Sequence, residues 1–467
     1  MPVGDLLPEI VLLLGAIVIV LTAVFTRQER QHWGAVLALV AVALSAWFAA
    51  GQWGAPSKLT FMGVWALDPA AVAAKLMILG AAAVVVALSP EWMATDRRHG
   101  EYYGLLLFAV LGAIMMAAAA DTMELMLGVL LSSAASYPLA AYHRAWGPSV
   151  EAGMKYYLIA ALANALLTVG VVLLFGLVGD TAYEATQATL ARDADAVALI
   201  AATAFVVVGL AFKMGAFPAH VWMPDVAQGA PAPIAAFLTV VPKIGAAVAL
   251  ARFVTLLPPD LAWRWIIAFI AVVTMTLGNL AALRQTDVRR LLGWSSVSQS
   301  GYALMAVVVL GLTEQALPAL LLFLLAYTVA NLAAFAVVVH WRGRTTLDDY
   351  HGLASAQPLA ATVLVVALLS LVGIPPLIGF FGKLALFSAA IDGGYAWLAV
   401  VAVANTVVSL FYYLSVIAPV VFADRKATLH ELGPWARAAS LTTGVLVLAF
   451  GLGAELLVGL GTVIASF

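Results

Sequence analysis

The sequence contains no cysteine, and charged residues make up only 10% of its 467 positions. Without cysteine, the chain can form no disulfide, no thiolate metal site and no cysteine-ligated iron–sulfur cluster. Soluble domains carry roughly 25% charged residues, so this chain has too few polar side chains to cover a soluble core of its size. These two shortages exclude a cysteine-ligated redox protein and an ordinary soluble domain.

Recognisable enzyme motifs are missing as well. The sequence has no P-loop, no GxGxxG after a strand, no HExxH and no pair of histidines at matched depth for a haem. The net charge of −2 gives no electrostatic signature for nucleic acid. We therefore expect no catalytic centre, cofactor or metal in this chain, and we expect any redox or hydrolytic reaction to occur on partner subunits.

Hydrophobic residues, in contrast, make up 64% of the sequence. Apolar runs repeat along the whole chain, and each is about 20 residues long, the length that a helix needs to cross a bilayer. The first run, Leu6 to Phe25, follows no basic segment, so we interpret it as a span and not as a cleaved signal. The sequence predicts an all-α membrane protein with about fourteen transmembrane helices. Their expected ranges are 6–25, 33–50, 69–89, 102–120, 121–141, 155–178, 195–226, 230–254, 263–283, 290–312, 315–340, 359–392, 395–422 and 438–463.

The distribution of basic residues orients these spans. Cytoplasmic connections carry an excess of lysine and arginine. With the N-terminus outside, the odd-numbered connections hold fourteen of the 22 basic residues and the even-numbered connections hold four, Arg252 among them. We therefore expect a bacterial inner-membrane protein with both termini on the periplasmic side.

The remaining four basic residues, all lysines, lie inside apolar runs, and they are the strongest indication of function in the sequence. A lysine at the bilayer centre costs about 2.5–3.5 kcal/mol on insertion scales, and such residues usually face a hydrated interior. Lys213, Lys243 and Lys383 are predicted to form a proton relay on this basis. Lys75 lies only six residues into its run, so we expect it to extend to the membrane surface.

Other polar side chains inside the spans are candidates for the same relay. Glu124, one turn inside the fifth span, either pairs with a buried lysine or simply suits a helix N-terminus. His220 follows Lys213 by seven residues, nominally on the same helical face. Five further polar residues either connect the relay or form interhelical hydrogen bonds: Tyr327, Asn331, Ser295, Ser296 and Ser298. His340 is either a relay group or an anchor at the membrane interface.

Two of the expected spans are interrupted by proline beside a lysine. Pro218 follows Lys213, and Pro375 with Pro376 precedes Lys383, so spans seven and twelve should both be broken. Broken spans at matching positions are typical of inverted repeats, here spans four to eight and nine to thirteen. The predicted domains are 1–90, three N-terminal helices; 91–255, the first repeat; 256–422, the second, inverted repeat; and 423–467, a C-terminal helix.

Several separate blocks of the sequence resemble one known family. The segment FKMGAFPAHVWMPDVAQGAPAPIAAFLTVVPKIGA is similar to the hallmark segment of the antiporter-like subunits of respiratory complex I, and its PDVAQGAP stretch is in the style of subunit N. GNLAALRQTDVRRLLGWSSVSQSGY and GIPPLIGFFGKLALFSAAIDGGYAWLAVVAVANTVVSLFYYL resemble the later spans of the same subunits. The resemblance covers roughly residues 100 to 420.

The resemblance implies a proton-translocating membrane-arm subunit of a complex I-type NADH:quinone oxidoreductase, with Lys213, Lys243 and Lys383 as the lysines of its channel. Such a chain would be a non-catalytic subunit without a redox centre. NADH, FMN, iron–sulfur clusters and quinone would be bound by partner subunits, and quinone reduction there would drive transport. Its neighbours would be other antiporter-like subunits, small helical subunits and membrane lipids.

The sequence departs from the family at one position. The family's glutamate in span five corresponds to Leu130, and the nearest acid, Glu124, lies six residues earlier, roughly 9 Å along a helix and 120° around it. Two alternatives therefore stay open. The chain could belong to an Mrp-like cation/proton antiporter or a membrane-bound hydrogenase, or it could be a divergent paralogue whose channel is impaired.

Overall fold

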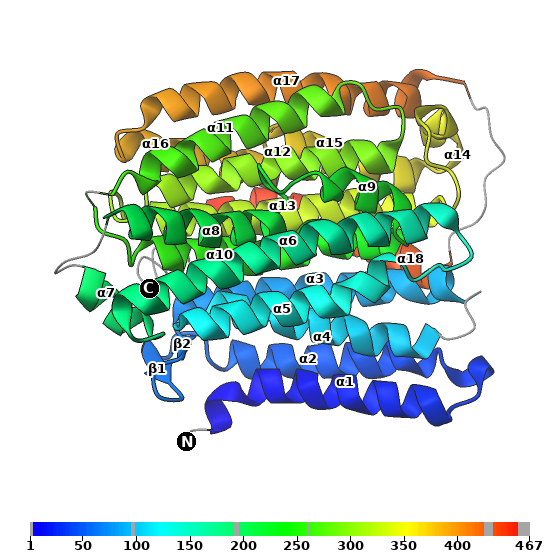
Figure 1. Cartoon of the computed structure of the whole chain (residues 1–467). Coiled ribbons are helices and arrows are strands. Elements are labelled where there is room, and N and C mark those ends of the chain that lie inside the picture. Colours follow the sequence, from blue (N-terminus) through cyan, green and yellow to red (C-terminus); the bar gives the residue numbers. More distant parts are fainter. Residues whose placement is uncertain (1–2, 95–98, 191–195, 260, 425–432, 456–467) are drawn as a thin grey trace.

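The computed structural model describes residues 3–94, 99–190, 196–259, 261–424 and 433–455, and most of them lie in helices that run side by side in roughly the same direction (Figure 1). The helices are α1 (Leu7–Phe25), α2 (Trp33–Ala50), α3 (Pro69–Met93), α4 (His99–Ala118), α5 (Thr122–Ala140), α6 (Gly147–Val178), α7 (Tyr183–Leu190), α8 (Ala196–Met214), α9 (Trp222–Gly229), α10 (Ala232–Val254), α11 (Trp263–Ala282), α12 (Val288–Val308), α13 (Ala316–His340), α14 (Leu353–Ala356), α15 (Pro358–Val372), α16 (Ile378–Asp392), α17 (Ala396–Phe422) and α18 (Pro434–Leu452). A short antiparallel hairpin, β1 (Lys58–Thr60) with β2 (Trp65–Leu67), connects α2 to α3.

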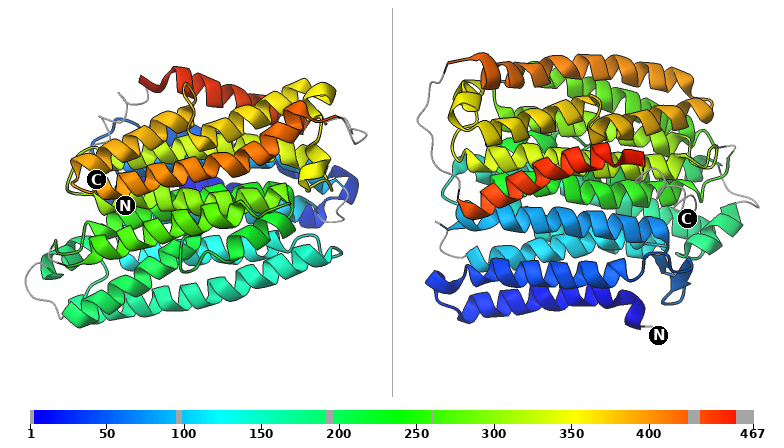
Figure 2. Two further views of the ribbon diagram at one scale, coloured as in Figure 1. Left: turned by 90° about the horizontal axis from the view of Figure 1, so that it is seen from above. Right: turned by 180° about the vertical axis from the view of Figure 1, so that it is seen from behind.

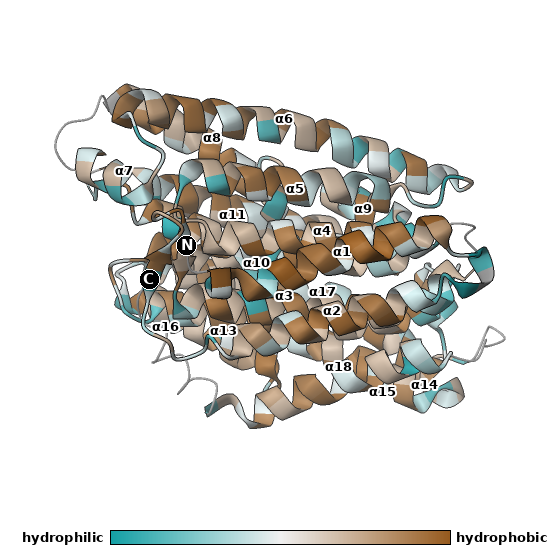
Figure 3. Ribbon diagram, turned by 90° about the horizontal axis from the view of Figure 1, so that it is seen from below, coloured by the Kyte–Doolittle hydropathy of each residue, from teal (hydrophilic) through white to brown (hydrophobic). Residues whose placement is uncertain are grey.

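The predicted all-α membrane fold is confirmed. Within the described ranges, twelve helices are long and apolar enough to cross a membrane, so the chain is a multi-pass membrane protein. Figure 3 shows hydrophobic residues along the helices and hydrophilic residues mainly towards the ends. Two expected spans are not among the twelve: range 290–312 corresponds to α12, which is rich in serine, and range 359–392 is divided between α15 and α16. The exact number of crossings stays a prediction.

The helices form a packed bundle with α10 near its centre. Every residue of α10 is buried, and the helix contacts α3, α4, α8, α12 and α13. A side chain at Gly245 would place its Cβ 2.4 Å from the Ala113 carbonyl oxygen of α4, so glycine permits this close approach. Helices α1 and α2 lie at one side of the bundle and α17 at the other (Figure 1), while α18 crosses behind it against α3, α13 and α15 (Figure 2).

Both proline-containing spans are broken where the sequence predicts. The first break separates α8, which ends at Met214, from α9, and the second separates α15 from α16. Each break has a glycine in the left-handed region, with φ of 68° at Gly215 and 99° at Gly373, a conformation that glycine adopts without the steric cost of a Cβ. Each also contains a cis peptide bond before proline, at Pro218 and Pro376.

Some expected boundaries differ from those observed. Helix α6 begins at Gly147, eight residues before the expected start of span six, because Pro148 occupies its first turn, where proline is favoured. The polar stretch after α6 contains the short helix α7. The last part of the expected span 438–463, beyond residue 455, lies outside the described residues.

The expectation that Lys75 extends to the membrane surface is wrong. Its side chain is fully buried, with Nζ 2.8 Å from Glu9 Oε1 and 3.2 Å from Gln52 Oε1. Glu9 belongs to α1, and Gln52 follows α2. Packing of α1 and α2 against α3 therefore supplies partners that the position of Lys75 in the sequence does not reveal.

A second buried ion pair joins the N-terminal helices to α10. Arg252 lies in the last turn of α10, not in a connection as expected, and its guanidinium donates to both carboxylate oxygens of Asp68, at 2.6 and 3.0 Å. Asp68 also caps α3 by accepting from the Ala71 N–H at 2.8 Å. A bidentate pair of this kind fixes orientation as well as distance.

Asp68→Ala should destabilise the protein by roughly 3–5 kcal/mol, because removal of one partner leaves the other charge buried and uncompensated. Thermal unfolding of the purified protein in detergent measures the effect. Lys58→Ala is the control, since it breaks the exposed Lys58–Asp5 pair and should cost at most about 1 kcal/mol. Equal losses in the two variants would contradict the structural role of the buried pair.

Candidate functional site

The three lysines of the predicted relay are all buried, with exposed fractions of 0% for Lys213, 1% for Lys243 and 3% for Lys383. They come from α8, α10 and α16, respectively. Among the residues that the structure describes, no carboxylate oxygen lies within 4.0 Å of any of their ammonium nitrogens. Hydroxyl oxygens, carbonyl oxygens and aromatic rings surround these cations instead.

The central lysine has the most developed environment. Lys243 Nζ donates to the carbonyl oxygen of Ser296 at 2.6 Å and to its Oγ at 2.8 Å, and it lies 4.4 Å from the ring centroid of Tyr327. The Tyr327 hydroxyl is 2.8 Å from Ser296 Oγ and 2.9 Å from the Thr239 carbonyl oxygen. Asn331 Nδ2 donates to Thr239 Oγ1 at 2.9 Å. Tyr327 and Asn331, predicted as connectors, thus lie in one polar cluster with Lys243.

Lys213 lies in the last turn of α8, directly before the first break. Its Nζ donates to Ser132 Oγ of α5 at 3.2 Å and lies 5.7 Å from the ring centroid of Phe212. The C-terminal end of a helix carries a partial negative charge, which favours a cation there. The helix end that the break creates therefore stabilises the ammonium group electrostatically.

Lys383 is placed beside the second break. Its Nζ donates at 2.9 Å to the carbonyl oxygen of Val372, the last residue of α15, and lies 4.5 Å from the ring centroid of Tyr302. The last carbonyl groups of a helix have no intrahelical partner. The broken span thus provides a backbone acceptor that an unbroken helix would lack.

Helix α12 connects the surroundings of the three lysines. Ser296 contacts Lys243, and one turn later the Ser300 hydroxyl is 2.5 Å from the carbonyl oxygen of Met214, the residue after Lys213, and 3.1 Å from that of Ser296. Gln299 Nε2 donates at 3.2 Å to the carbonyl oxygen of Leu371, which precedes the Lys383 acceptor. The candidates predicted from the sequence include some serines of this helix but not Gln299 and Ser300. The run SSVSQS in an otherwise apolar segment was the available signal.

His220 is not on a shared helical face with Lys213, because α8 ends at Met214 and the seven-residue spacing crosses the break. Its ring is 94% buried and packs against Phe217 and Trp294, with centroid distances of 6.1 and 5.8 Å. Its Nδ1 has no hydrogen-bond partner. The structure therefore places His220 near the break but not in contact with a described lysine.

Two other candidates lie away from the lysines. Glu124 is half-buried in the first turn of α5, eight residues before Ser132, which is roughly 12 Å along the helix. His340 ends α13 with Nε2 2.9 Å from Gln357 Oε1, about 13 Å along the helix from Asn331. The structure does not bring either side chain to the relay cluster, so their roles in the relay stay predictions.

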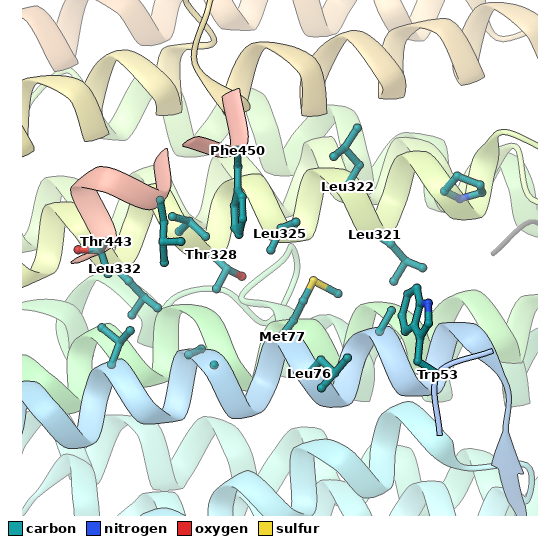
Figure 4. Close-up of a pocket in the computed structure, with 17 residues that line it drawn as sticks. Trp53, Leu76, Met77, Leu321, Leu322, Leu325, Thr328, Leu332, Thr443 and Phe450 are labelled. Carbon is teal, nitrogen blue, oxygen red and sulfur yellow. The ribbon is translucent and has the colours of Figure 1, made fainter. Parts of the chain in front are cut away.

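An apolar cavity of about 350 Å³ lies between α3, α13 and α18 (Figure 4). Leu76, Met77, Leu325 and Phe450 point into it, and its few polar atoms include the hydroxyls of Thr328 and Thr443. This lining offers no charged group to carry a proton. In the described part of the chain, no cluster of three or more histidine, aspartate and glutamate residues could hold a metal ion.

Comparisons with known proteins show the family of this chain. The family model described as NADH:quinone oxidoreductase/Mrp antiporter, TM, matches residues 119–409, a range that contains all three relay lysines. The chain belongs to this family. It is 44% identical over 448 residues to the NADH-quinone oxidoreductase subunit N of Mycobacterium sp. (strain JLS), covering 94% of this chain and 95% of that protein. It is 45% identical to subunit N 1 of Streptomyces griseus subsp. griseus, covering 96% and 95%.

Solved structures show the same fold. The chain is similar to a subunit of respiratory complex I from Thermus thermophilus with bound Aureothin, with a TM-score of 0.84 and 30% identity over 97% of this chain and 99% of that one. A chain of the Mrp complex from Dietzia sp. DQ12-45-1b has a TM-score of 0.88 at 24% identity, over 100% and 97%. The second likeness shows a shared fold.

Ser296→Ala should lower proton translocation severalfold while the folded bundle is retained, because Lys243 and Tyr327 lose the hydroxyl that they share. Proton uptake by inverted membrane vesicles, related to the rate of substrate oxidation, measures the effect. Ser295→Ala is a matched control, since Ser295 is equally buried on the same helix but bonds to Tyr413. A control as defective as Ser296→Ala would contradict the specific role of Ser296.

Proposed function

We propose that this chain is the proton-translocating subunit N of a complex I-type NADH:quinone oxidoreductase. The observation that carries the proposal is a set of three buried lysines that have no carboxylate partner among the described residues and whose surroundings are connected by the polar side chains of α12. The subunit N relatives at 44–45% identity and the complex I likeness support the same assignment. The chain supplies the proton path, and partner subunits supply the driving reaction.

The chemistry of the site suits proton transfer. A lysine ammonium that gives up its proton becomes a neutral amine. The neutral oxygen atoms around it can accept hydrogen bonds from both forms, so no charged partner is left behind when the proton leaves. Ser296 Oγ accepts from Lys243 Nζ and from the Tyr327 hydroxyl, each at 2.8 Å, and donates to the Thr239 carbonyl oxygen at 3.3 Å. Because a hydroxyl both accepts and donates, Ser296 links Lys243 and Tyr327 through one shared group. The relay runs between Lys213, Lys243 and Lys383, and His220 and Glu124 are its outer members.

The expected cofactors, neighbouring subunits and membrane location follow from the same family. NADH, FMN, iron–sulfur clusters and quinone belong to partner subunits, and other antiporter-like and small helical membrane subunits surround this chain. The Thermus thermophilus and Dietzia structures are both multi-subunit complexes, which supports such neighbours. The distribution of basic residues supports a place in the bacterial inner membrane with both termini on the periplasmic side.

An Mrp-like cation/proton antiporter is the second candidate function. The Dietzia Mrp complex shares the fold, and a lysine relay could serve either assembly. The named relatives at the highest identities favour the first function. A divergent paralogue with an impaired channel is the third candidate, because Leu130 occupies the position of the family glutamate. Lys213 nevertheless has a polar partner, Ser132, which favours a working site.

Lys243→Ala should lower NADH-driven proton pumping by at least about tenfold, as expected when a positioned proton-transfer group is lost. The assay is acidification of inverted membrane vesicles, with subunit composition checked by gel after purification. Lys58→Ala, which changes an exposed lysine, should pump normally. Normal pumping by an assembled Lys243→Ala complex would rule out the proposed relay.

The partners of the purified chain distinguish the first two functions. A complex that contains a flavin- and iron–sulfur-bearing arm and a quinone module is expected. Sodium-dependent proton flux by the isolated chain in liposomes, without a quinone reductase, would instead establish the antiporter function. Mass spectrometry of the purified membrane complex and flux measurements in liposomes are the two assays.

A further inference from the structure

The apolar cavity between α3, α13 and α18 has no part in the proposed proton path. Among the described residues, no acidic or basic side chain lines it, and every lining residue except Trp53 belongs to one of these three helices. Each of the three is long and apolar enough to cross a membrane. At this depth the surroundings of the chain are lipid hydrocarbon or apolar helices of other subunits, so these are the two candidates for its occupant.

The cavity is open along one side of the bundle, at Gly80 of α3. Gly80 is exposed, and a Cβ built on it would meet no atom of another described segment within 4 Å. Around it, Met77 of α3 and Leu322 and Leu325 of α13 are only partly buried, although they line the cavity. A molecule can therefore enter from the membrane without passing through the helix bundle. We call this cavity the lateral groove.

The lateral groove is as long as one leaflet of a bilayer. Its lining on α3 extends from Ala73 to Val84, a distance of roughly 16 Å along a helix, and one leaflet contributes about 15 Å of hydrocarbon to the bilayer core. Figure 4 shows Trp53 at one end of the groove, and Leu332 with Thr443 at the other. Trp53 is 36% exposed, and tryptophan is enriched at the level of the lipid headgroups. The groove thus extends from a headgroup level towards the middle of the membrane.

The width of the lateral groove decides between the two candidates. Its volume of about 350 Å³, distributed over roughly 16 Å of helix, gives a mean cross-section of roughly 22 Å², which is a slot roughly 5 Å across. A helix with its side chains is about 10 Å in diameter, whereas carbon atoms in contact lie about 3.5–4.0 Å apart. The groove therefore accepts one chain of methylene groups but not a helix of another subunit.

The few polar atoms of the lining give a polar ligand little to bind. The Thr443 hydroxyl already donates to the Ala439 carbonyl oxygen of its own helix at 2.9 Å. Thr328 Oγ1 has no hydrogen-bond partner among the described residues, but a single hydroxyl cannot satisfy a charged headgroup. Met77 and Leu325, which point into the groove (Figure 4), offer apolar surface instead. The lining is thus suited to a hydrocarbon chain.

We propose that the lateral groove binds one acyl chain of a membrane phospholipid, with the headgroup beside Trp53 and the end of the chain near Leu332. This inference goes beyond the proposed function and does not rest on it. A chain in this position packs against Leu325 of α13, whereas Tyr327, on another face of the same helix, contacts Lys243. The lipid therefore completes the packing around α13 on a side that does not face the central lysine.

Photochemical cross-linking to lipid tests the inference. The purified whole complex is mixed with a phosphatidylcholine that carries a diazirine in its acyl chain, washed with detergent to remove loosely bound lipid, and irradiated. Peptide mass spectrometry should find the label on Met77 and Leu325 after the wash. Leu162, which is 60% exposed on α6, is the control and should be labelled only before the wash. Equal loss of both labels in the wash would overturn the proposal, because the contact would then be that of bulk lipid.

Substitutions of Gly80 supply the matched variants. Gly80→Phe places a ring in the open part of the groove and should lower the retained label on Leu325 severalfold, whereas Gly80→Ala adds only one methyl group and should keep it. Gly176→Phe changes another exposed glycine with no atom within 4 Å of its Cβ, on α6, and should also keep the label. Gly80→Leu is the alternative if the phenylalanine variant does not assemble. Wild-type labelling in an assembled Gly80→Phe or Gly80→Leu complex would overturn the proposal.

The same variants separate the remaining outcomes. If Gly80→Phe removes a neighbouring subunit while Gly80→Ala retains it, and no lipid labels the groove of the wild type, the groove is a subunit contact and the proposal is wrong. The expected result is a complete set of subunits in every variant. Added phospholipid should raise the thermal unfolding temperature of the delipidated wild type more than that of Gly80→Phe. Proton pumping by Lys243→Ala bears only on the proposed function, so each idea can fail alone.

Discussion

An ammonium group buried among apolar helices must find oxygen atoms that replace the water it has lost. Lys383 finds the free carbonyl of Val372 at the end of α15, Lys213 finds a serine hydroxyl at the end of α8, and Lys243 finds Ser296. Among these three environments, only that of Lys383 depends on a carbonyl oxygen that a helix break frees, whereas Lys213 lies at the helix end that the other break creates. The helix breaks and the position of α12 thus provide oxygen atoms and a helix end that stabilise these buried cations.

The chain contains two kinds of buried cation, and their partners distinguish them. Lys75 and Arg252 are paired with Glu9 and Asp68, and such pairs hold α1, α3 and α10 together. The relay lysines have only neutral partners within the part of the chain that is described. A carboxylate partner favours a permanent charge, whereas hydroxyls and carbonyls accept hydrogen bonds from an amine as well as from an ammonium. The unpaired lysines are thus the ones suited to changing charge.

The two broken spans have their lysines on opposite sides of the break along the chain. Lys213 precedes the break between α8 and α9, whereas Lys383 follows the break between α15 and α16, and both ammonium groups lie beside the end of the first half-helix. Inverted repeats at spans four to eight and nine to thirteen, and the division at 91–255 and 256–422, therefore stay a proposal. Helix α12 belongs to the proposed second repeat, yet it contacts Lys243 of the proposed first repeat. Hydrogen bonds across the repeat boundary therefore join the two halves of the path.

The sequence by itself determined the helices, the two breaks and the buried lysines, because the length of an apolar run, a proline and a charge are local properties. It also carried the family resemblance. Only the tertiary structure decided which polar groups meet. Lys75 pairs with a residue 66 positions away, Ser296 reaches Lys243 from 53 positions away, and Ser132 reaches Lys213 from 81. The expected face shared by Lys213 and His220 failed because a helical register ends at a break. Contacts between distant helices depend on how their surfaces pack, which the spacing of residues along one helix does not specify.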